Sequence, residues 1–338
     1  MTAVWLNGLL DGATSLLSPG GARGRLSILI YHRVLPAADP MRPGEVHRAT
    51  FEWHMALLAR HFRVLPLREA CRALAQGTLP ARALAITFDD GYADNAGVAL
   101  PILQRFGLPA TFFVATSFLD GGRMWNDSII ELARRIPRGE LDLEDLGFGR
   151  YRIEGDESRR LLARSVIAAA KYLETDARAD RVAALVDRCD VTLPNDLMLT
   201  SDQVRQLVTG GMEVGGHTDR HPILASIDAQ QARQEIKRGK SRLEDIVGEP
   251  LRLFAYPNGK PGRDYRYEHR ELVRELGFEA AVSTHWGAAS TASDLYQLPR
   301  FTPWHGDALR FRLALMRNVW SREQPGAGTP LQAARGPS

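Results

Sequence analysis

Two adjacent aspartates, Asp89 and Asp90, come directly after an apolar run at residues 84–88, and Gly91 follows them. An apolar run without polar partners is typical of a strand covered on both faces, and a glycine after it supplies the turn that ends the strand. The two carboxylates are therefore expected at the carboxyl end of a buried strand. In a parallel α/β sheet or barrel, the loops at that end build the functional site. A plain Asp-Asp-Gly turn is the alternative that this stretch alone leaves open.

Two histidines four residues apart, His217 and His221, form a second polar cluster after the short apolar run at residues 212–214. Glycines precede the first histidine, and Pro222 disfavours the α conformation at the second, so the cluster is predicted on a strand-to-helix loop. Most such histidine pairs are surface or core residues. Neutral imidazole and carboxylate, however, are ligands that suit Zn²⁺ and similar divalent ions. Taken with the aspartate pair, the sequence predicts a catalytic metal site with one carboxylate, two imidazoles and positions left for water and substrate.

The two clusters resemble the first two signature motifs of the polysaccharide deacetylase family, also called the NodB-homology domain or carbohydrate esterase family 4. The motifs are TFDDG at residues 87–91 and HTDRH at residues 217–221. A third stretch, FAYPNG at residues 254–259, is similar to the third motif of that family. The resemblance extends over about residues 26–304, in the same order of motifs.

The resemblance implies an α/β fold, a distorted (β/α) barrel of seven or eight strands. It also implies that Asp90, His217 and His221 hold the metal and that Asp89 is the general base. This assignment suits the hydrolysis of an acetamide, because a divalent ion lowers the pKa of bound water from near 16 to about 7 and polarises the amide carbonyl. A base beside the ion takes the proton of that water, and positioned proton transfer typically contributes around 10²–10⁴-fold.

Three further residues are candidates for contact with the substrate. By resemblance, the backbone N–H of Asn258 matches the family position that donates to the oxyanion. Tyr256 lies in the same YPNG stretch, which taken alone is typical of a plain β-turn. Trp125 is a candidate to stack on a sugar ring, although a place in the core is the more common outcome for a tryptophan.

The third motif departs from the family pattern at Ala255. In the family, an arginine usually stands at this position, two residues before the proline, where it holds the catalytic aspartate. Another cation must therefore orient Asp89 here. Arg300 and Arg33 are the two candidates, and the sequence offers no reason to choose between them.

The general acid is a second open point. The aspartate-tryptophan pair of the family's fourth motif is absent. For the general-acid histidine of the fifth motif, His305 is a loose match, and His32 at the end of the first strand competes with it as acid or substrate contact. Family variants with a YHxV-type first strand and a YPxG third motif resemble this chain better, and they act on extracellular or capsular-type glycans.

Strand-like runs alternate with helix-like segments over most of the chain, which is typical of βαβ units and a parallel sheet. Between residues 125 and 199 the pattern changes to charged helical segments without an evident barrel strand, so we predict a helical insertion there. We expect an N-terminal amphipathic helix and loop at residues 1–25, the barrel at residues 26–320 and a disordered tail at residues 321–338. The last strand is expected near residues 297–301.

The composition is that of an ordinary soluble globular protein, with 44% hydrophobic and 25% charged residues. The formal net charge of +3 is small and the basic residues are scattered, so nucleic acid is not an expected partner.

No apolar run is long enough for a transmembrane segment, and the N-terminal residues do not form a convincing signal peptide. We therefore expect a cytoplasmic location, with the membrane face as an alternative. The N-terminal helix would dock on the barrel, which is favoured, or make peripheral contact with a membrane.

These observations and the resemblance together predict metal-dependent removal of N-acetyl groups from hexosamine residues of a polysaccharide or glycan precursor. Zn²⁺ is the expected metal. Two alternatives stay open. A narrow, closed cleft would favour a hydrolase of the same fold that acts on a small amide. The missing arginine at Ala255 and the missing fourth motif would favour a carbohydrate-binding relative that has lost turnover.

Overall fold

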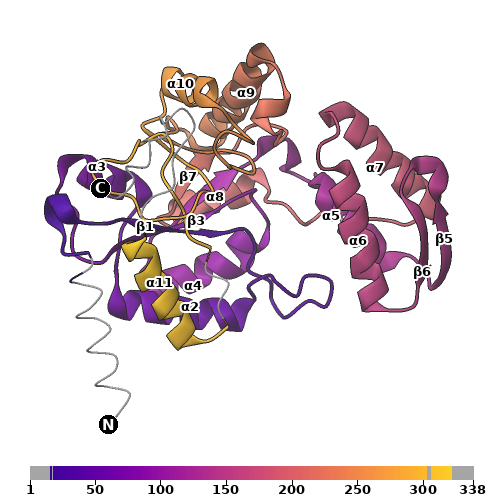
Figure 1. Cartoon of the computed structure of the whole chain (residues 1–338), viewed down its shortest axis with the longest axis horizontal. Helices are drawn as coiled ribbons and strands as arrows, with labels where there is room; N and C mark the ends of the chain where they lie inside the picture. Colours follow the sequence, from indigo (N-terminus) through magenta and orange to yellow (C-terminus); the bar gives the residue numbers. More distant parts are fainter. Residues whose placement is uncertain (1–15, 17, 303–305, 322–338) are drawn as a thin grey trace, which may run out of the picture.

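A curled parallel sheet forms the centre of the protein (Figure 1). The computed structural model describes residues 16, 18–302 and 306–321. Within that part, the sheet has seven strands, six of them in the order β1-β3-β4-β7-β8-β9, with β2 paired to the beginning of β3. All of its ladders are parallel. The strands are β1 (Ser27–Tyr31), β2 (Arg63–Val64), β3 (Ala83–Phe88), β4 (Thr111–Val114), β7 (Glu213–Gly216), β8 (Leu253–Ala255) and β9 (Ala280–Val282).

A short segment at residues 298–301 lies between the two outer strands of this sheet. Leu298 forms a parallel bridge to β9, and Phe301 forms a parallel bridge to β1. Between them, Pro299 has no N–H to give to a ladder, so the segment pairs at single points and is not a full strand. These bridges bring the first and last strands together, and the predicted distorted barrel is confirmed. The strand expected near residues 297–301 is reduced to this pair of bridges.

Helices cover the outside of the sheet (Figure 1), and one apolar cluster fills the space between the helices and the strands, while the alternate strand residues form a second cluster. Strands β1 and β3 are buried along their whole length, as predicted for the run before Asp89. Within the core, the rings of Phe88 and Phe112 stack with their centroids 4.6 Å apart. The covering helices are α2 (Arg48–His61), α3 (Leu67–Gln76), α4 (Leu100–Phe106), α8 (Ser201–Thr209), α9 (Ala229–Val247), α10 (Tyr267–Glu275) and α11 (Ala308–Trp320).

The segment at residues 125–199, called the insertion below, lies to one side of the sheet and has a hydrophobic core of its own (Figure 1). Its helices are α5 (Trp125–Arg135), α6 (Asp156–Ala170) and α7 (Thr175–Cys189). The prediction of helices alone is wrong in one respect, because β5 (Gly139–Leu143) and β6 (Gly149–Ile153) form an antiparallel hairpin. Apolar residues alternate along both strands, so that the hairpin buries Leu143 and Ile153 in the core of the insertion.

The two ends of the chain lie largely outside the described residues. The predicted N-terminal amphipathic helix falls mostly on residues 1–15 and the predicted tail on residues 322–338, and neither range is described. In the part of the first segment that is described, Gly21–Arg23 forms one turn of 3₁₀ helix. None of the helices in the described ranges is both long and apolar enough to cross a membrane.

Candidate metal centre

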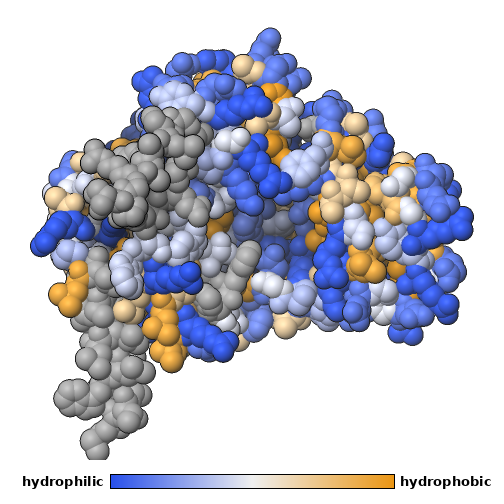
Figure 2. All heavy atoms as spheres, in the orientation of Figure 1, coloured by the Kyte–Doolittle hydropathy of each residue, from blue (hydrophilic) through white to orange (hydrophobic). Residues whose placement is uncertain are grey.

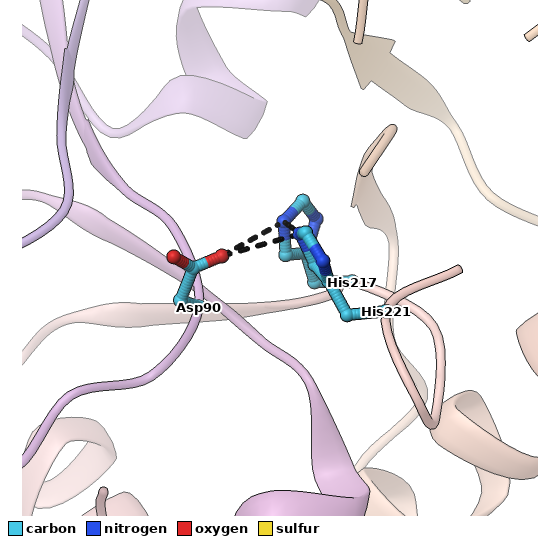
Figure 3. A group of neighbouring side chains, drawn as sticks. All are labelled: Asp90, His217 and His221. Atoms are coloured by element: carbon cyan, nitrogen blue, oxygen red, sulfur yellow. Dashed lines mark hydrogen bonds and ion pairs between the residues drawn. The ribbon is translucent and has the colours of Figure 1, made fainter. Parts of the chain in front are cut away.

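Asp90, His217 and His221 point toward one another at the carboxyl edge of the sheet (Figure 3). The Oδ1 atom of Asp90 lies 3.4 Å from Nε2 of His217 and 3.3 Å from Nε2 of His221. The two Nε2 atoms are 3.1 Å apart. One carboxylate oxygen and two imidazole nitrogens at these separations can bind a single divalent ion. The structure therefore brings together the three residues that the sequence predicts as ligands.

The three side chains come from loops after two strands that are not neighbours. Asp90 follows β3 and His217 follows β7, and β4 lies between these strands. Neighbouring strands are about 4.8 Å apart, so the side chains must cross a gap of about 10 Å. Asp90, Thr218 and His221 have φ angles of 74°, 66° and 55°. Such left-handed backbone is uncommon outside glycine and concentrates at functional sites, and here it accompanies side chains that converge on one point.

A hydrogen bond on the far side of its ring orients His217. Its Nδ1–H donates to the backbone oxygen of Ala255 at 2.7 Å, so the lone pair of Nε2 in the neutral ring faces Asp90 and His221. Histidine ligands of metals generally have an outer partner of this kind. Ala255, where the arginine of the family is missing, thus still contacts the site through its backbone.

The electrostatics of the site also fit a cation. Burial lowers the pKa of His221 to about 4, against the opposing charge of Asp90, so this imidazole is neutral at neutral pH, as a metal ligand must be. Burial also acts to lower the pKa of His217, but contacts with Asp90 and Asp89 raise it above its ordinary value. The two carboxylates therefore favour positive charge at this point. A divalent ion bound here would supply that positive charge in place of a proton on His217.

Asp89 lies beside the candidate metal centre and pairs with Arg300. The guanidinium donates to both carboxylate oxygens at 2.7 Å, and its Nε–H donates to the backbone oxygen of Ser283 at 2.7 Å. Burial alone would raise the pKa of Asp89, but the charge of Arg300 holds it below its ordinary value, so Asp89 is ionised. Of the two cations that the sequence offers, Arg33 pairs with Asp94 at 2.8 Å. The cation that orients Asp89 is therefore Arg300.

A cleft of about 850 Å³ includes the three candidate metal ligands and Asp89 in its lining. The rest of the lining comes from the edge of the sheet, from the loop at residues 41–47 between β1 and α2, and from the insertion. Figure 2 shows the surface hollowed between the insertion and the rest of the molecule. The cleft is thus shared between the sheet and the insertion.

Three of the remaining predicted residues, His32, Trp125 and Asn258, line this cleft. The prediction for Tyr256 is wrong, because its side chain is fully buried and stacks on a neighbouring tyrosine with ring centroids 3.8 Å apart. Successive residues at the end of a strand point to opposite sides. Tyr256 faces the core, and the turn after it, with a φ of 58° at Asn258, carries that residue to the cleft. The other predicted acid, His305, lies outside the described residues.

Part of the lining is not predicted by the sequence. Asn126, Lys171 and Arg178 of the insertion line the cleft, whereas Trp125 is the one cleft residue of the insertion that is predicted above as a substrate contact. For the loop at residues 41–47 a signal existed, because a loop after the carboxyl end of a barrel strand belongs to the functional face. Nothing in the helical pattern of the insertion indicates which of its faces meets the cleft.

The chain belongs to the polysaccharide deacetylase family, because the family profile described as polysaccharide deacetylase matches residues 76–147 and 156–281. The matched ranges contain the aspartate pair, the histidine pair and the YPNG turn. The family acts by de-N-acetylation of polysaccharides, and its members are hydrolases of carbon–nitrogen bonds other than peptide bonds. The predicted family and the predicted class of enzyme are confirmed.

Individual relatives agree with the family. The Bacillus subtilis (strain 168) protein YxkH, which is named after polysaccharide deacetylases, is 22% identical over 278 residues, or 82% of this chain and 70% of YxkH. The structure of the Streptococcus pyogenes deacetylase PplD in complex with acetate is similar with a TM-score of 0.60 and 20% identity, over 87% of this chain and 98% of that chain. IcaB from Ammonifex degensii is similar with a TM-score of 0.54 and 20% identity, over 88% and 97%. At these identities the two structures establish the fold.

Proposed function

We propose that this protein hydrolyses the N-acetyl group of a hexosamine in a polysaccharide or glycan precursor, with a divalent ion held by Asp90, His217 and His221. The observation that carries the proposal is the convergence of these three ligands beside the ionised carboxylate of Asp89 in one cleft. The donor set of one carboxylate and two imidazoles favours Zn²⁺. When bound, such an ion lowers the pKa of water and polarises an amide carbonyl.

Asp89 takes the proton of the attacking water. Its carboxylate lies in the lining of the cleft, and both of its oxygens are held by Arg300, so one orientation is fixed before the substrate binds. The same pairing keeps Asp89 ionised. Proton transfer to a base positioned in this way contributes about 10²–10⁴-fold to the rate.

Two further groups complete the reaction. As the water oxygen bonds to the acetyl carbon, the backbone N–H of Asn258 donates to the carbonyl oxygen, where negative charge develops. The carbon–nitrogen bond then breaks, and the nitrogen leaves as an amine after it accepts a proton. We assign that proton to His32, which lines the same cleft as Asp89 and Asp90. The products are acetate and the free amino sugar.

Two observations favour this function over the alternatives. The cleft opens between the sheet and the insertion (Figure 2), whereas a hydrolase of small amides is expected to have a narrow, closed site. Ala255 suggested a binding protein without turnover, but Arg300 supplies the cation that the missing arginine would have provided. A cytoplasmic location and peripheral contact with a membrane stay predictions from the sequence.

Acetate release tests the proposal directly. The protein is stripped of metal with a chelator, reloaded with Zn²⁺, and incubated with chitooligosaccharides and with acetylated bacterial polysaccharides. We expect acetate from the reloaded protein and none from the stripped protein, whose circular dichroism shows whether the fold is retained. Bound metal without acetate from any glycan would support the binding protein, and release from small acetamides alone would support the small-amide hydrolase.

A further inference from the structure

Two basic side chains of the insertion, Lys171 and Arg178, line the cleft, and neither forms an ion pair within the described ranges. Arg178 is only 6% exposed. Its Nη1 donates to the backbone oxygen of Lys171 at 3.3 Å. Charged side chains are almost never this deeply buried unless they are paired. A buried guanidinium without a carboxylate in the wall of a substrate cleft indicates that its partner comes from the ligand.

The charged groups around Arg178 do not neutralise it. On the same helix, the carboxylate of Glu174 caps the helix by accepting from the N–H of Asp176. Arg220, between the two histidine ligands, pairs with Asp176. Burial lowers the pKa of Arg178, the charge of Glu174 opposes this, and the charge of Arg220 adds to it. The position therefore keeps uncompensated positive charge, whose cost in free energy a bound anion would offset.

Trp125 holds Arg178 in place without neutralising it. The guanidinium carbon lies 4.8 Å from the centroid of the Trp125 ring, and a cation–π contact leaves the N–H groups at the guanidinium edge available to a ligand. The next residue, Asn126, also lines the cleft, and its Oδ1 is buried without a hydrogen-bond partner in the described part of the chain. A sugar hydroxyl is a donor that suits this oxygen.

We propose that Lys171 and Arg178 bind an anionic group of the substrate, a carboxylate or a phosphate, in the same cleft as the metal centre. The guanidinium presents two parallel N–H donors that match the oxygens of either anion, and Lys171 adds a second positive charge. The site would select an acidic glycan or a phosphorylated precursor over a neutral chitooligosaccharide. That the ligand contains an acetylated sugar rests on the proposed function. Binding of the anionic group, however, can be measured whether or not the enzyme turns the ligand over.

Isothermal titration calorimetry of the zinc-loaded protein with two matched pairs of ligands tests the proposal. The first pair is a hyaluronan tetrasaccharide, which carries carboxylates, and the neutral chitotetraose. The second pair is N-acetylglucosamine 1-phosphate and the neutral methyl N-acetylglucosaminide. In one pair we expect the anionic ligand to bind about tenfold more tightly, or better, than its neutral partner, and the preference to shrink with added salt. The pair that shows the preference identifies the anion as carboxylate or phosphate.

Variants assign the preference to the named residues. Arg178→Gln is expected to abolish it, Arg178→Lys to retain part of it, and Lys171→Gln, at a less buried position, to reduce it several-fold. Arg181→Gln, an exposed position on the same helix and outside the cleft lining, should keep it in full. Equal affinities within both pairs, or a preference that survives Arg178→Gln, would overturn the proposal. Preferential binding of an anionic ligand without acetate release would overturn the proposed function and leave this inference standing.

Discussion

Arg300 and Arg178 are both almost fully buried, with exposed fractions of 1% and 6%, and yet their electrostatic surroundings are opposite. Arg300 gives two hydrogen bonds to Asp89 and so completes an ion pair inside the chain. Arg178 contacts an aromatic ring and a backbone oxygen, with no carboxylate within ion-pair distance among the described residues. The first arrangement fixes the orientation of the proposed base, and the second leaves a charge for the proposed anionic ligand. The edge of the sheet around Arg300 is therefore suited to hydrolysis, and the insertion around Arg178 is suited to binding the substrate.

The two parts are also held in place differently. Asp90 and His217 come within two residues of the ends of β3 and β7, so the ladders of the sheet fix their positions. The insertion is tied to the loop after β1 by side chains, such as the pair of Arg42 with the fully buried Asp127. Substitutions at the edge of the sheet are therefore expected to change kcat, and substitutions on the insertion to change the affinity for the substrate.

The largest effect is expected from His217→Ala. This change leaves two of the three proposed ligands, Asp90 and His221, and two ligands do not make the three-ligand site that catalytic zinc requires. We expect loss of bound zinc, measured by elemental mass spectrometry, together with loss of acetate release to background. Retained zinc affinity would remove His217 from the set of ligands.

The next largest effect is expected from Asp89→Asn, which removes the base and keeps the ligands. We expect kcat for acetate release to fall about 10²–10⁴-fold, while the zinc content stays near one equivalent. Loss of zinc together with activity would show that Asp89 is a ligand and that the roles of the two aspartates are misassigned.

Arg300→Met tests whether Arg300 orients Asp89 and keeps its carboxylate ionised. Breaking a buried ion pair typically costs about 3–5 kcal/mol in the free energy of unfolding, which denaturant titration measures. Without Arg300, burial raises the pKa of Asp89, so the acid limb of the pH–rate profile moves to higher pH. Arg33→Met breaks the buried pair with Asp94 and is the control. It should lose comparable stability without moving that limb, and an equal shift in both variants would contradict the assignment of Arg300.

The smallest effect is expected on the insertion, from Trp125→Leu. This change removes the ring that orients Arg178, and a cation–π contact at a partly desolvated site is worth about 3–10-fold in affinity. The anionic ligand of the preferred pair should weaken by that factor, and its neutral partner by less, as measured by calorimetry. Equal weakening of both would indicate that Trp125 stacks on the sugar and does not act through Arg178.

The predicted residues that the structure brings together at the candidate metal centre lie in segments that obey short-range rules. Asp90 follows an apolar strand, and the histidine pair lies between glycines and Pro222, so the backbone within a few residues already indicates a turn at the end of a strand. The β5–β6 hairpin shows how far such rules extend. Apolar residues alternate there, but the strands are only five residues long and rich in charged residues, so the sequence predicts helical segments alone in this region. The prediction for Tyr256 is wrong for another reason. The side of the sheet that this side chain faces depends on tertiary packing, which the neighbouring residues in the sequence do not specify.

By itself, the amino-acid sequence determined the family, the convergence of Asp90, His217 and His221 as candidate metal ligands, and the edge of the sheet where they meet, because those features depend on contiguous motifs. Only the tertiary structure decided that Arg300, 211 residues away in the chain, orients Asp89, and that Lys171 and Arg178 face the same cleft. The physical reason is that an ion pair between distant residues, or the absence of one, depends on which surfaces the folded chain brings together. Local spacing of residue types contains no information about that contact.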